Sequence, residues 1–215
     1  MAGYMLKKCK KTIVVIVAHP DDETLWSGGT ILSHPKCDWF IVSLCRGKDS
    51  DRSKKFFKAL EALNAQGIMG DLDDEPEQKP LKPKKIETAI LNLLPLKHFD
   101  MIISHSPVGE YTKHLRHEEI GRAVIKLWHT NKIAANCFWA FAYDDGNKEY
   151  LPRAIEKAPI ITNLSAQIWK KKHKIITATY GFDNNSWEAQ TTPKTEAFWQ
   201  FGNPSEATNW LKKIK

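Results

Sequence analysis

The feature that most constrains the fold is the run TIVVIVA at residues 12–18, which a polar turn follows at once. Uninterrupted β-branched residues predict a strand that is buried on both faces, as in a parallel sheet covered by helices. Four more short apolar segments are predicted to be strands, at residues 38–44, 68–72, 99–104 and 136–142. Helical patterns separate most of them. This alternation predicts a Rossmann-like, doubly wound α/β fold with a mostly parallel sheet and helices on both faces.

Helices are expected at residues 24–32, 54–65, 84–94 and 118–128. In the second of these, Phe56, Phe57, Leu60 and Leu63 have the spacing of one apolar face. Beyond residue 142 the pattern weakens: residues 165–179 indicate a lysine-rich helix, and the tail from Tyr180 is predicted to be loop-like. Because no repeat or linker interrupts the chain, we expect a single domain over residues 1–215, with the motifs in a core of about 12–142.

Composition excludes several classes of protein. An apolar content of 42% is that of a globular chain. The longest apolar run, residues 13–18, is far shorter than the roughly 20 residues of a membrane span, and the N-terminus lacks a signal-peptide pattern. We therefore expect a cytoplasmic protein without a membrane span. Without a C-x-x-C pair, the four cysteines are expected to be free thiols: Cys9, Cys37, Cys45 and Cys137.

The net charge of +7 raises the question of a nucleic-acid partner. The basic residues are lysines spread along the chain, without an arginine-rich stripe or a nucleic-acid-binding motif. A lysine-rich solvated surface therefore explains the charge, and we expect no dedicated nucleic-acid partner. The sequence is compatible with a homo-oligomer but does not predict one.

Two dense clusters of polar residues directly follow predicted strands. The first is AHPDDE at residues 18–23, after the first strand, and the second is HSPVGEYTKHLRHEE at residues 105–119, after the fourth. In the common strand order 3-2-1-4-5, the first and fourth strands are neighbours at the topological switch point, where ligands bind. The two clusters are therefore expected to face one crevice.

The residue types in these clusters suit a catalytic metal site. His19 and Asp22 can both reach one cation at about 2.0–2.2 Å, and His117 from the second cluster completes three protein ligands with an open position for water. Asp21 adjoins Asp22 but is expected to point elsewhere, where it can take a proton from the attacking water. His114 is expected to face the same pocket without being a ligand.

Each of these residues also has a structural explanation. The acidic triplet could cap the following helix, and His114 and His117 could be exposed loop residues. The joint placement of both clusters at the switch point favours the functional interpretation. His105 is a candidate for a supporting role beside the metal ligands. The other histidines lack such partners and are left as surface or core residues: His34, His98, His129 and His173.

These residues resemble the signature of the LmbE-like / PIG-L N-acetylglucosaminyl deacetylases. The resemblance rests on AHPDDE, on Gly28-Gly29-Thr30 and on the H-x-x-H of His114 and His117, and it covers about residues 12–125. It implies that zinc, or another divalent transition metal, is bound by His19, Asp22 and His117, and that Asp21 is the general base. It also implies that His114, as a cation, stabilises the oxyanion or protonates the leaving amine. The implied substrate is an N-acetyl sugar, either a small molecule or a glycoconjugate.

The sequence departs from the family pattern at three places. The usual H-P-D-H is here interrupted by Leu115-Arg116, so the carboxylate that tunes the first histidine is missing; Glu110, Glu118 and Glu119 are candidate substitutes. Lys55 and Lys58 stand where the family often has arginine and glutamate. Tyr111 lies one residue further from His114 than usual.

The substrate side is predicted only in outline. Arg46 and Arg52, in the charged loop at residues 45–53, and Tyr111 are candidate substrate-binding residues. Trp26, Trp187 and Trp199 could stack on a sugar, although core packing is the commoner role of tryptophan.

Two alternative functions stay open. One is metal-dependent hydrolysis of a non-sugar N-acyl compound, and the other is a catalytically weak binding module that retains the metal loop. A nucleotide-binding Rossmann protein is disfavoured, because the first turn lacks G-x-G-x-x-G and its acidic residues repel phosphate.

Overall fold

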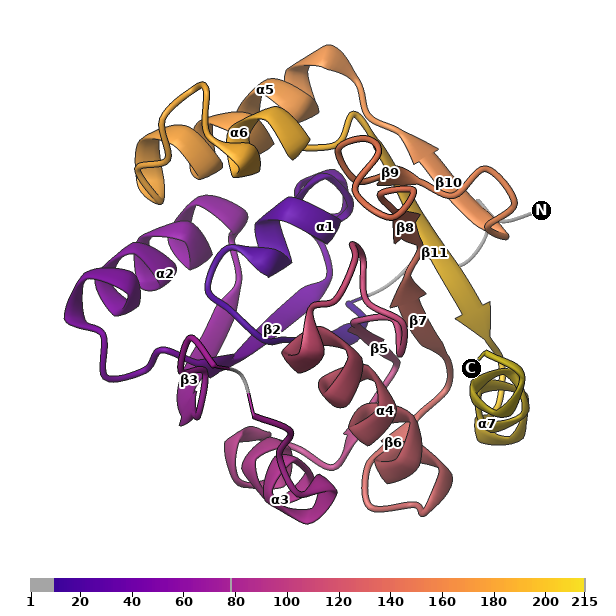
Figure 1. The fold of residues 1–215 in the computed structure, drawn as a ribbon. Helices are drawn as coiled ribbons and strands as arrows, with labels where there is room; N and C mark the ends of the chain where they lie inside the picture. Colours follow the sequence, from indigo (N-terminus) through magenta and orange to yellow (C-terminus); the bar gives the residue numbers. More distant parts are fainter. Residues whose placement is uncertain (1–9, 78, 215) are drawn as a thin grey trace.

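The computed structural model describes residues 10–77 and 79–214. A seven-stranded sheet crosses the molecule in the order β10-β11-β7-β5-β1-β2-β3 (Figure 1). Its strands are β1 (Thr12–Val17), β2 (Asp38–Cys45), β3 (Gln66–Leu72), β5 (Met101–Ser104), β7 (Phe138–Phe141), β10 (Ile160–Asn163) and β11 (Thr195–Phe201). The strands from β3 to β7 pair in parallel, whereas β11 and β10 add antiparallel pairs. The predicted mostly parallel sheet and its order 3-2-1-4-5 are confirmed.

Helices cover both faces of this sheet. One face carries α1 (Asp22–Ser33), α2 (Ser50–Leu63) and α5 (Ala166–Lys174), and the other carries α3 (Pro83–Leu93), α4 (Leu115–His129) and α7 (Pro204–Lys213). Alternate residues of β1 point to opposite sides: Ile13, Val15 and Val17 pack in one core, and Val14 and Ile16 in the other. Burial on both faces is why the sequence of β1 has no polar alternation.

Helices α2 and α4 begin three to four residues earlier than the apolar pattern indicates. Helix α2 begins at Ser50 rather than at residue 54, because the Asp49 carboxylate accepts hydrogen bonds from the backbone N–H groups of residues 51 and 52. Phe57 is 46% exposed, so its assignment to the apolar face was wrong. Helix α4 begins at Leu115 and not at residue 118. His117 therefore lies within its first turn, and His114 is its N-cap residue.

The predicted strand at residues 99–104 is divided in two. Strand β4 (His98–Phe99) pairs with β6 (Ala134–Ala135) in a separate two-stranded sheet, and β5 starts at Met101. Between them the Asp100 carboxylate accepts a hydrogen bond from the Thr12 N–H at 2.9 Å. A third small sheet pairs β8 (Tyr143–Asp144) with β9 (Arg153–Ala154).

The prediction of a loop-like tail from Tyr180 was wrong. Helix α5 continues as the π-helical turn Ile175–Thr179, as the 165–179 pattern predicted, and is followed by the short helix α6 (Trp187–Thr191), β11 and α7. Strand β11 is covered on both sides, so its sequence lacks the alternation that identifies a half-buried strand. Asn203 caps α7 and Pro204 is its first residue, a helix-start signal that the sequence does contain.

Cys37 and Cys45 are buried free thiols, as predicted; Cys137 is also buried, and Cys9 lies outside the described residues. Among residues 10–77 and 79–214, every helix is too short or too polar to cross a bilayer.

Candidate active site

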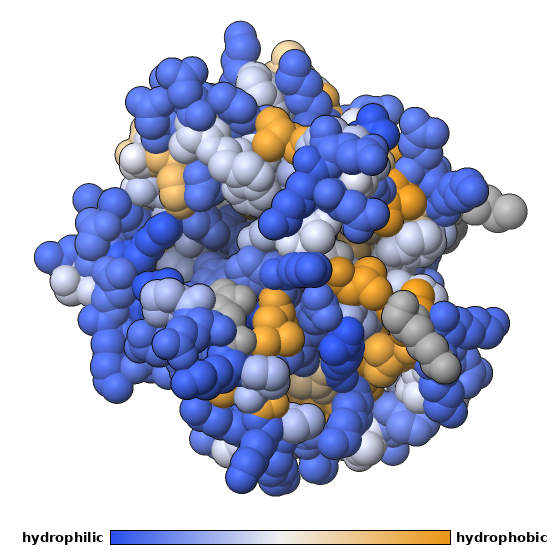
Figure 2. All heavy atoms as spheres, viewed as in Figure 1, coloured by the Kyte–Doolittle hydropathy of each residue, from blue (hydrophilic) through white to orange (hydrophobic). Residues whose placement is uncertain are grey.

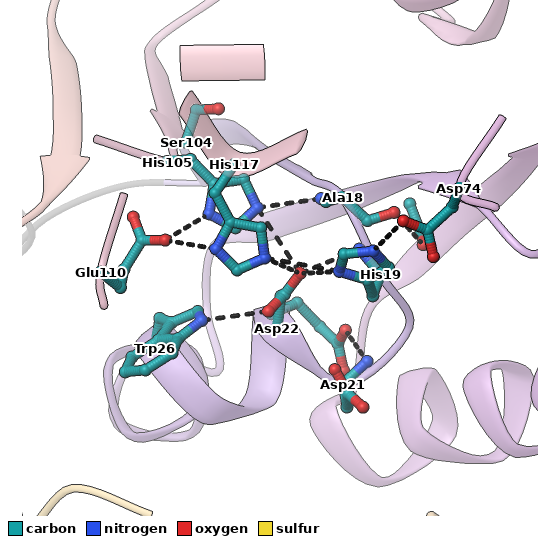
Figure 3. Close-up of polar contacts among 12 residues, drawn as sticks. Ala18, His19, Asp21, Asp22, Trp26, Asp74, Ser104, His105, Glu110 and His117 are labelled. Atoms are coloured by element: carbon teal, nitrogen blue, oxygen red, sulfur yellow. Dashed lines mark hydrogen bonds and ion pairs between the residues drawn. The ribbon is translucent and has the colours of Figure 1, made fainter. Parts of the chain in front are cut away.

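Figure 3 shows the two predicted clusters meeting at the carboxyl ends of β1 and β5. His19 follows β1 closely, and Asp22 is the first residue of α1. His117 comes from the first turn of α4, which the loop after β5 introduces. The pairing of β1 with β5 places these loops side by side, although 98 residues separate His19 from His117.

Three nitrogen and oxygen atoms of the predicted ligands form a compact triangle. His19 Nδ1 and His117 Nε2 lie 3.2 and 3.3 Å from Asp22 Oδ2, and the two nitrogens are 3.4 Å apart. Ligand atoms around a tetrahedral zinc at about 2.0–2.1 Å are roughly 3.3 Å from one another. The triangle therefore fits one face of such a coordination sphere, with the fourth position open.

Glu110 orients the histidine that α4 supplies. Its Oε2 atom accepts hydrogen bonds from the Nδ1 atoms of His117 at 2.7 Å and His105 at 2.8 Å. Burial favours the neutral carboxyl, but the interactions with both histidines hold the pKa of Glu110 at about 2. With its proton on Nδ1, His117 presents an unprotonated Nε2 toward His19 and Asp22, the tautomer that binds metals.

His105 lies directly beside the proposed ligand His117. Its Nε2 accepts a hydrogen bond from the Ala18 N–H at 2.9 Å, and its ring stacks on that of His117 with centroids 3.9 Å apart. Its Nδ1 donates to Glu110, so both nitrogens of the ring have hydrogen-bond partners. The expectation that His105 lies beside the ligands agrees with this position.

Carboxylates dominate the charge around His19. Its Nε2 lies 3.2 Å from Asp74 Oδ1, on the side opposite to Asp22. Burial lowers the pKa of His19, but hydrogen bonds with Asp22 and Asp74 raise it to about 10. The Nε1–H of Trp26 donates to Asp22 Oδ1 at 3.1 Å and fixes that carboxylate as well. A site with this excess of buried carboxylate favours a bound cation.

Asp21 has an unusual backbone conformation. Its φ of 125° and ψ of −31° are rarely adopted by a residue with a side chain, and its N–H is held by Glu23 Oε2 at 3.0 Å. The side chain turns away from the ligand triangle and accepts a hydrogen bond from Arg52 Nη1 at 3.2 Å. Burial and the neighbouring Asp22 raise the pKa of Asp21 well above its usual range. A carboxylate with a raised pKa is a stronger base.

His114 faces the same site but lacks a carboxylate partner. Its ring stacks on His117 at 3.9 Å, and its buried Nδ1 has no hydrogen-bond partner among the described residues. Burial and the nearby His117 and His19 lower the pKa of His114 to about 3. Of the three glutamates considered as substitutes, Glu110 contacts His105 and His117, Glu118 pairs with Arg122, and Glu119 pairs with Arg116.

Arg116 stands where the family usually has an aspartate, and it has a structural role there. Its guanidinium is fully buried and donates to the Asp73 carbonyl at 2.6 Å, the Lys79 carbonyl at 3.0 Å and Glu119 Oε2 at 2.6 Å. Glu119 in turn accepts a hydrogen bond from the Leu81 N–H. Arg116 therefore fastens the loop between β3 and α3, and this loop delivers Asp74 to His19.

Sequence reasoning missed Asp74. It belongs to the acidic stretch DDE at residues 73–75, which follows the third strand at the carboxyl edge of the sheet. That placement was the available signal. Asp74, His19 and Cys45 also lie within 4.8 Å of one another, but the contact between His19 Nε2 and Asp74 is accounted for by a hydrogen bond.

A cavity of about 490 Å³ opens onto these residues. The predicted substrate-binding residues Arg46, Arg52 and Tyr111 all line it. Arg46 is paired with Asp74 at 2.9 Å and Arg52 with Asp21, while the Tyr111 ring makes an edge contact with that of His114. In the view of Figure 2, the same face of the molecule has a hollow near its middle with mostly hydrophilic side chains.

Of the other residues considered for the site, only some line the cavity. Trp187 lines the cavity, whereas Trp26 is fully buried and Trp199 packs against Trp210. Lys55 pairs with Asp51 at 2.6 Å and does not line the cavity.

Comparison with known proteins agrees with this geometry. A family model described as PIG-L, GlcNAc-PI de-N-acetylase, matches residues 14–128, just over half of the chain. An uncharacterized protein of Acanthamoeba polyphaga mimivirus is 22% identical in an alignment 179 positions long, which covers 76% of this chain and 76% of that one.

Two solved structures share the fold. The N,N'-diacetylchitobiose deacetylase from Pyrococcus horikoshii has a TM-score of 0.68 at 16% identity, over 89% of this chain and 84% of that one. The zinc inhibited form of a teicoplanin deacetylase has a TM-score of 0.60 at 12% identity, over 88% and 97%. Likeness at these identities shows the fold alone, and the family match adds the class of reaction. The chain therefore belongs to the PIG-L family of de-N-acetylases and is a hydrolase of amide bonds.

Proposed function

We propose that this protein is a zinc-dependent deacetylase acting on an N-acetylglucosamine-containing small molecule or glycoconjugate. The observation that carries the proposal is the triangle of His19, Asp22 and His117 donor atoms beside the half-buried carboxylate of Asp21. Nitrogen and oxygen donors at tetrahedral spacing with one open position are typical of catalytic zinc sites. The family match and the sugar deacetylase among the structural neighbours support the substrate class.

In this proposal, His19, Asp22 and His117 hold the metal. When bound, it would supply Lewis-acid chemistry, making water more acidic and polarising the acyl oxygen. Glu110 keeps the His117 proton on Nδ1, and Asp74 keeps the His19 proton on Nε2. Both rings therefore stay oriented as ligands.

Asp21 is the proposed general base. Its carboxylate lies beside the ligand triangle without belonging to it, and its raised pKa suits proton transfer from the attacking water. The hydrogen bond from Arg52 holds its orientation.

His114 is the group proposed to stabilise the acyl oxygen of the amide. Its ring lies against His19 and His117, near the place where the acyl oxygen develops charge. Because no carboxylate contacts it and its pKa is lowered, the imidazole is neutral at neutral pH and stabilises the oxyanion by donating a hydrogen bond. This differs from the cationic role that the family resemblance implied.

The substrate contacts are assigned to the cavity wall. Arg46 and Arg52 form one side and Tyr111 the other. Each arginine already pairs with a site carboxylate, so these side chains orient the site and offer their remaining N–H groups to sugar hydroxyls.

Metal analysis combined with an acetate-release assay tests the proposal. We expect about one zinc per chain, loss of activity on chelation and recovery on adding zinc, with N-acetyl sugars hydrolysed in preference to N-acyl amino acids. Preference for N-acyl amino acids would favour the non-sugar hydrolase. Metal binding without turnover of any N-acyl compound would favour the binding module.

A further inference from the structure

A segment far along the chain lies close to Asp21, the proposed general base. It comprises residues 180–182, which follow the π-helical turn Ile175–Thr179 and precede α6. Figure 1 shows this part of the chain lying over α1 and α2, and both helices contact the π-helical turn. The segment is therefore close to two neighbours of Asp21, namely Glu23 on α1 and Arg52 on α2.

The hydroxyl of Tyr180 is bonded to Glu23. It donates to Glu23 Oε1 at 2.7 Å, and the hydroxyl of Thr24 donates to the same oxygen at 2.6 Å. The other oxygen of this carboxylate, Oε2, accepts a hydrogen bond from the N–H of Asp21 at 3.0 Å. Tyr180 is 2% exposed and Glu23 is fully buried, so water does not compete for these bonds. Tyr180 thus fixes the group that holds the Asp21 N–H.

This contact matters because the backbone of Asp21 is strained. A φ of 125° with a ψ of −31° is rarely adopted by a residue with a side chain, and it persists only where the surroundings hold it. The Asp21 carbonyl accepts hydrogen bonds from the N–H groups of Thr24 and Leu25 at 3.0 and 2.8 Å. With the carbonyl fixed by the helix and the N–H fixed by Glu23, the direction in which the Asp21 side chain leaves the backbone is set as well.

The carboxylate of Asp21 is held from the same segment. Arg52 Nη1 donates to Asp21 Oδ2 at 3.2 Å, and the guanidinium carbon of Arg52 lies 5.1 Å from the centre of the Phe182 ring. A guanidinium over an aromatic face is attracted by the ring and restricted in its orientation. Tyr180 and Phe182 therefore act on the two ends of one residue, on the backbone through Glu23 and on the carboxylate through Arg52.

The π-helical turn fixes the position of this segment. The Tyr180 N–H donates to the Ile175 carbonyl at 2.9 Å, five residues earlier, and the Phe182 N–H donates to the Ile176 carbonyl at 3.3 Å. Ile175 and Ile176 are buried in the core. Single π-helical turns occur frequently at functional sites. The segment also lies outside residues 14–128, the part of the chain that the family model matches.

We propose that Tyr180 and Phe182 are positioning residues for the general base. Tyr180, through Glu23, holds the strained backbone of Asp21, and Phe182, through Arg52, orients its carboxylate for proton transfer. Neither residue lines the active-site cavity, so both act only through other side chains. This inference rests on the proposed function, in which Asp21 takes the proton.

Steady-state kinetics of Tyr180→Phe, which removes only the hydroxyl, test the inference. The assay uses zinc-loaded protein and whichever of N-acetylglucosamine and N,N'-diacetylchitobiose the wild type hydrolyses. We expect kcat to fall at least fivefold, with KM and zinc affinity within twofold of wild type, because a misplaced base slows proton transfer and leaves binding unchanged. Phe182→Leu should show the same split, with a loss in kcat of at least threefold.

Tyr143→Phe is the matched control. Tyr143 is also 2% exposed, and its hydroxyl also donates to α1, at the Trp26 carbonyl at 2.9 Å. This variant loses a buried hydrogen bond to the same helix but none of the contacts of Asp21. Its melting temperature should therefore fall about as far as that of Tyr180→Phe, whereas its kcat should stay within twofold of wild type. Equal losses of kcat in the two variants would show a general loosening of α1 and overturn the positioning role.

The remaining outcomes separate this inference from the proposed function. If kcat is lost in Asp21→Ala but unchanged in Tyr180→Phe, the positioning role is overturned and the deacetylase stands. A KM or zinc affinity that changes as much as kcat in Tyr180→Phe would also overturn it. Full activity of Asp21→Ala, or release of acetate from neither sugar by the wild type, would instead contradict the proposed function and remove this inference with it.

Discussion

The Asp74 carboxylate lies 3.2 Å from His19 Nε2, on the far side of the ring from Asp22. The proposed metal ligand is thus held between two carboxylates, one from the first residue of α1 and one from the loop after β3. A carboxylate behind a ligating histidine fixes the ring and makes it a better donor.

Replacing Asp74 is therefore expected to weaken metal binding. Asp74→Asn should lower zinc affinity about 10- to 100-fold. Competition with a chromophoric chelator measures this without any substrate. Asp71→Asn is the matched control, because Asp71 lies at the end of the same strand and pairs with the exposed Lys48. Equal zinc affinity of both variants and the wild type would contradict the role given to Asp74.

Asp21→Ala should separate metal binding from catalysis. The substitution removes the proposed base but none of the three proposed ligands, so we expect zinc content to stay near wild type. General-base catalysis contributes about 10²- to 10⁴-fold, and kcat should fall by that order. Metal analysis and acetate release on the same preparation measure both. Activity equal to that of the wild type would show that Asp21 is not the base.

Removing the buried guanidinium of Arg116 should be costly. Arg116→Met leaves the Asp73 and Lys79 carbonyls without this donor and Glu119 without its partner. Breaking a buried pair costs about 3–5 kcal/mol of unfolding free energy. Urea denaturation measures it. The control is Arg122→Met on the same helix, where the pair with Glu118 is half-exposed and worth less than about 1 kcal/mol. Similar losses of unfolding free energy in the two variants would contradict the role of Arg116 in fastening the loop between β3 and α3.

Glu87 should contribute to the acid side of the stability profile. A hydrogen bond from Lys126, opposed by burial and aided by Lys132, lowers the pKa of Glu87 below its ordinary value of 4.5. A lowered pKa in the folded state gives stability that is present above about pH 4.5 and is lost as the pH falls through the folded pKa.

Glu87→Gln should therefore lower the free energy of unfolding at pH 7 by about 0.5–1 kcal/mol, with a difference from wild type that shrinks below pH 4.5. Urea denaturation at several pH values measures this difference. Glu61→Gln, at an exposed position of α2, is the control. A difference that is constant from pH 7 to pH 3 would contradict the role of the Glu87 charge.

The sequence by itself determined the parallel part of the sheet and the convergence of the three proposed metal ligands. A strand buried on both faces, such as β1, has a composition that shows its environment directly, and parallel strands place their carboxyl ends at one edge. His19, Asp22 and His117 could be brought together on these grounds because strand order requires neighbouring loops to converge. The start of α2 was hidden because its cap, Asp49, lies before the apolar pattern begins.

Tertiary structure alone decided the hydrogen-bond and packing partners of these residues. Asp74 reaches His19 because Arg116, 42 positions further along the chain, fastens its loop, and no local pattern encodes that contact. Glu110 bonds two histidines and leaves His114 without a carboxylate, a distribution set by side-chain directions in space. The rings of Tyr111 and Trp187 are in contact although 76 residues separate them in the sequence. Hydrogen bonding and packing between distant segments depend on the assembled fold, so their outcome appears only once the chain is folded.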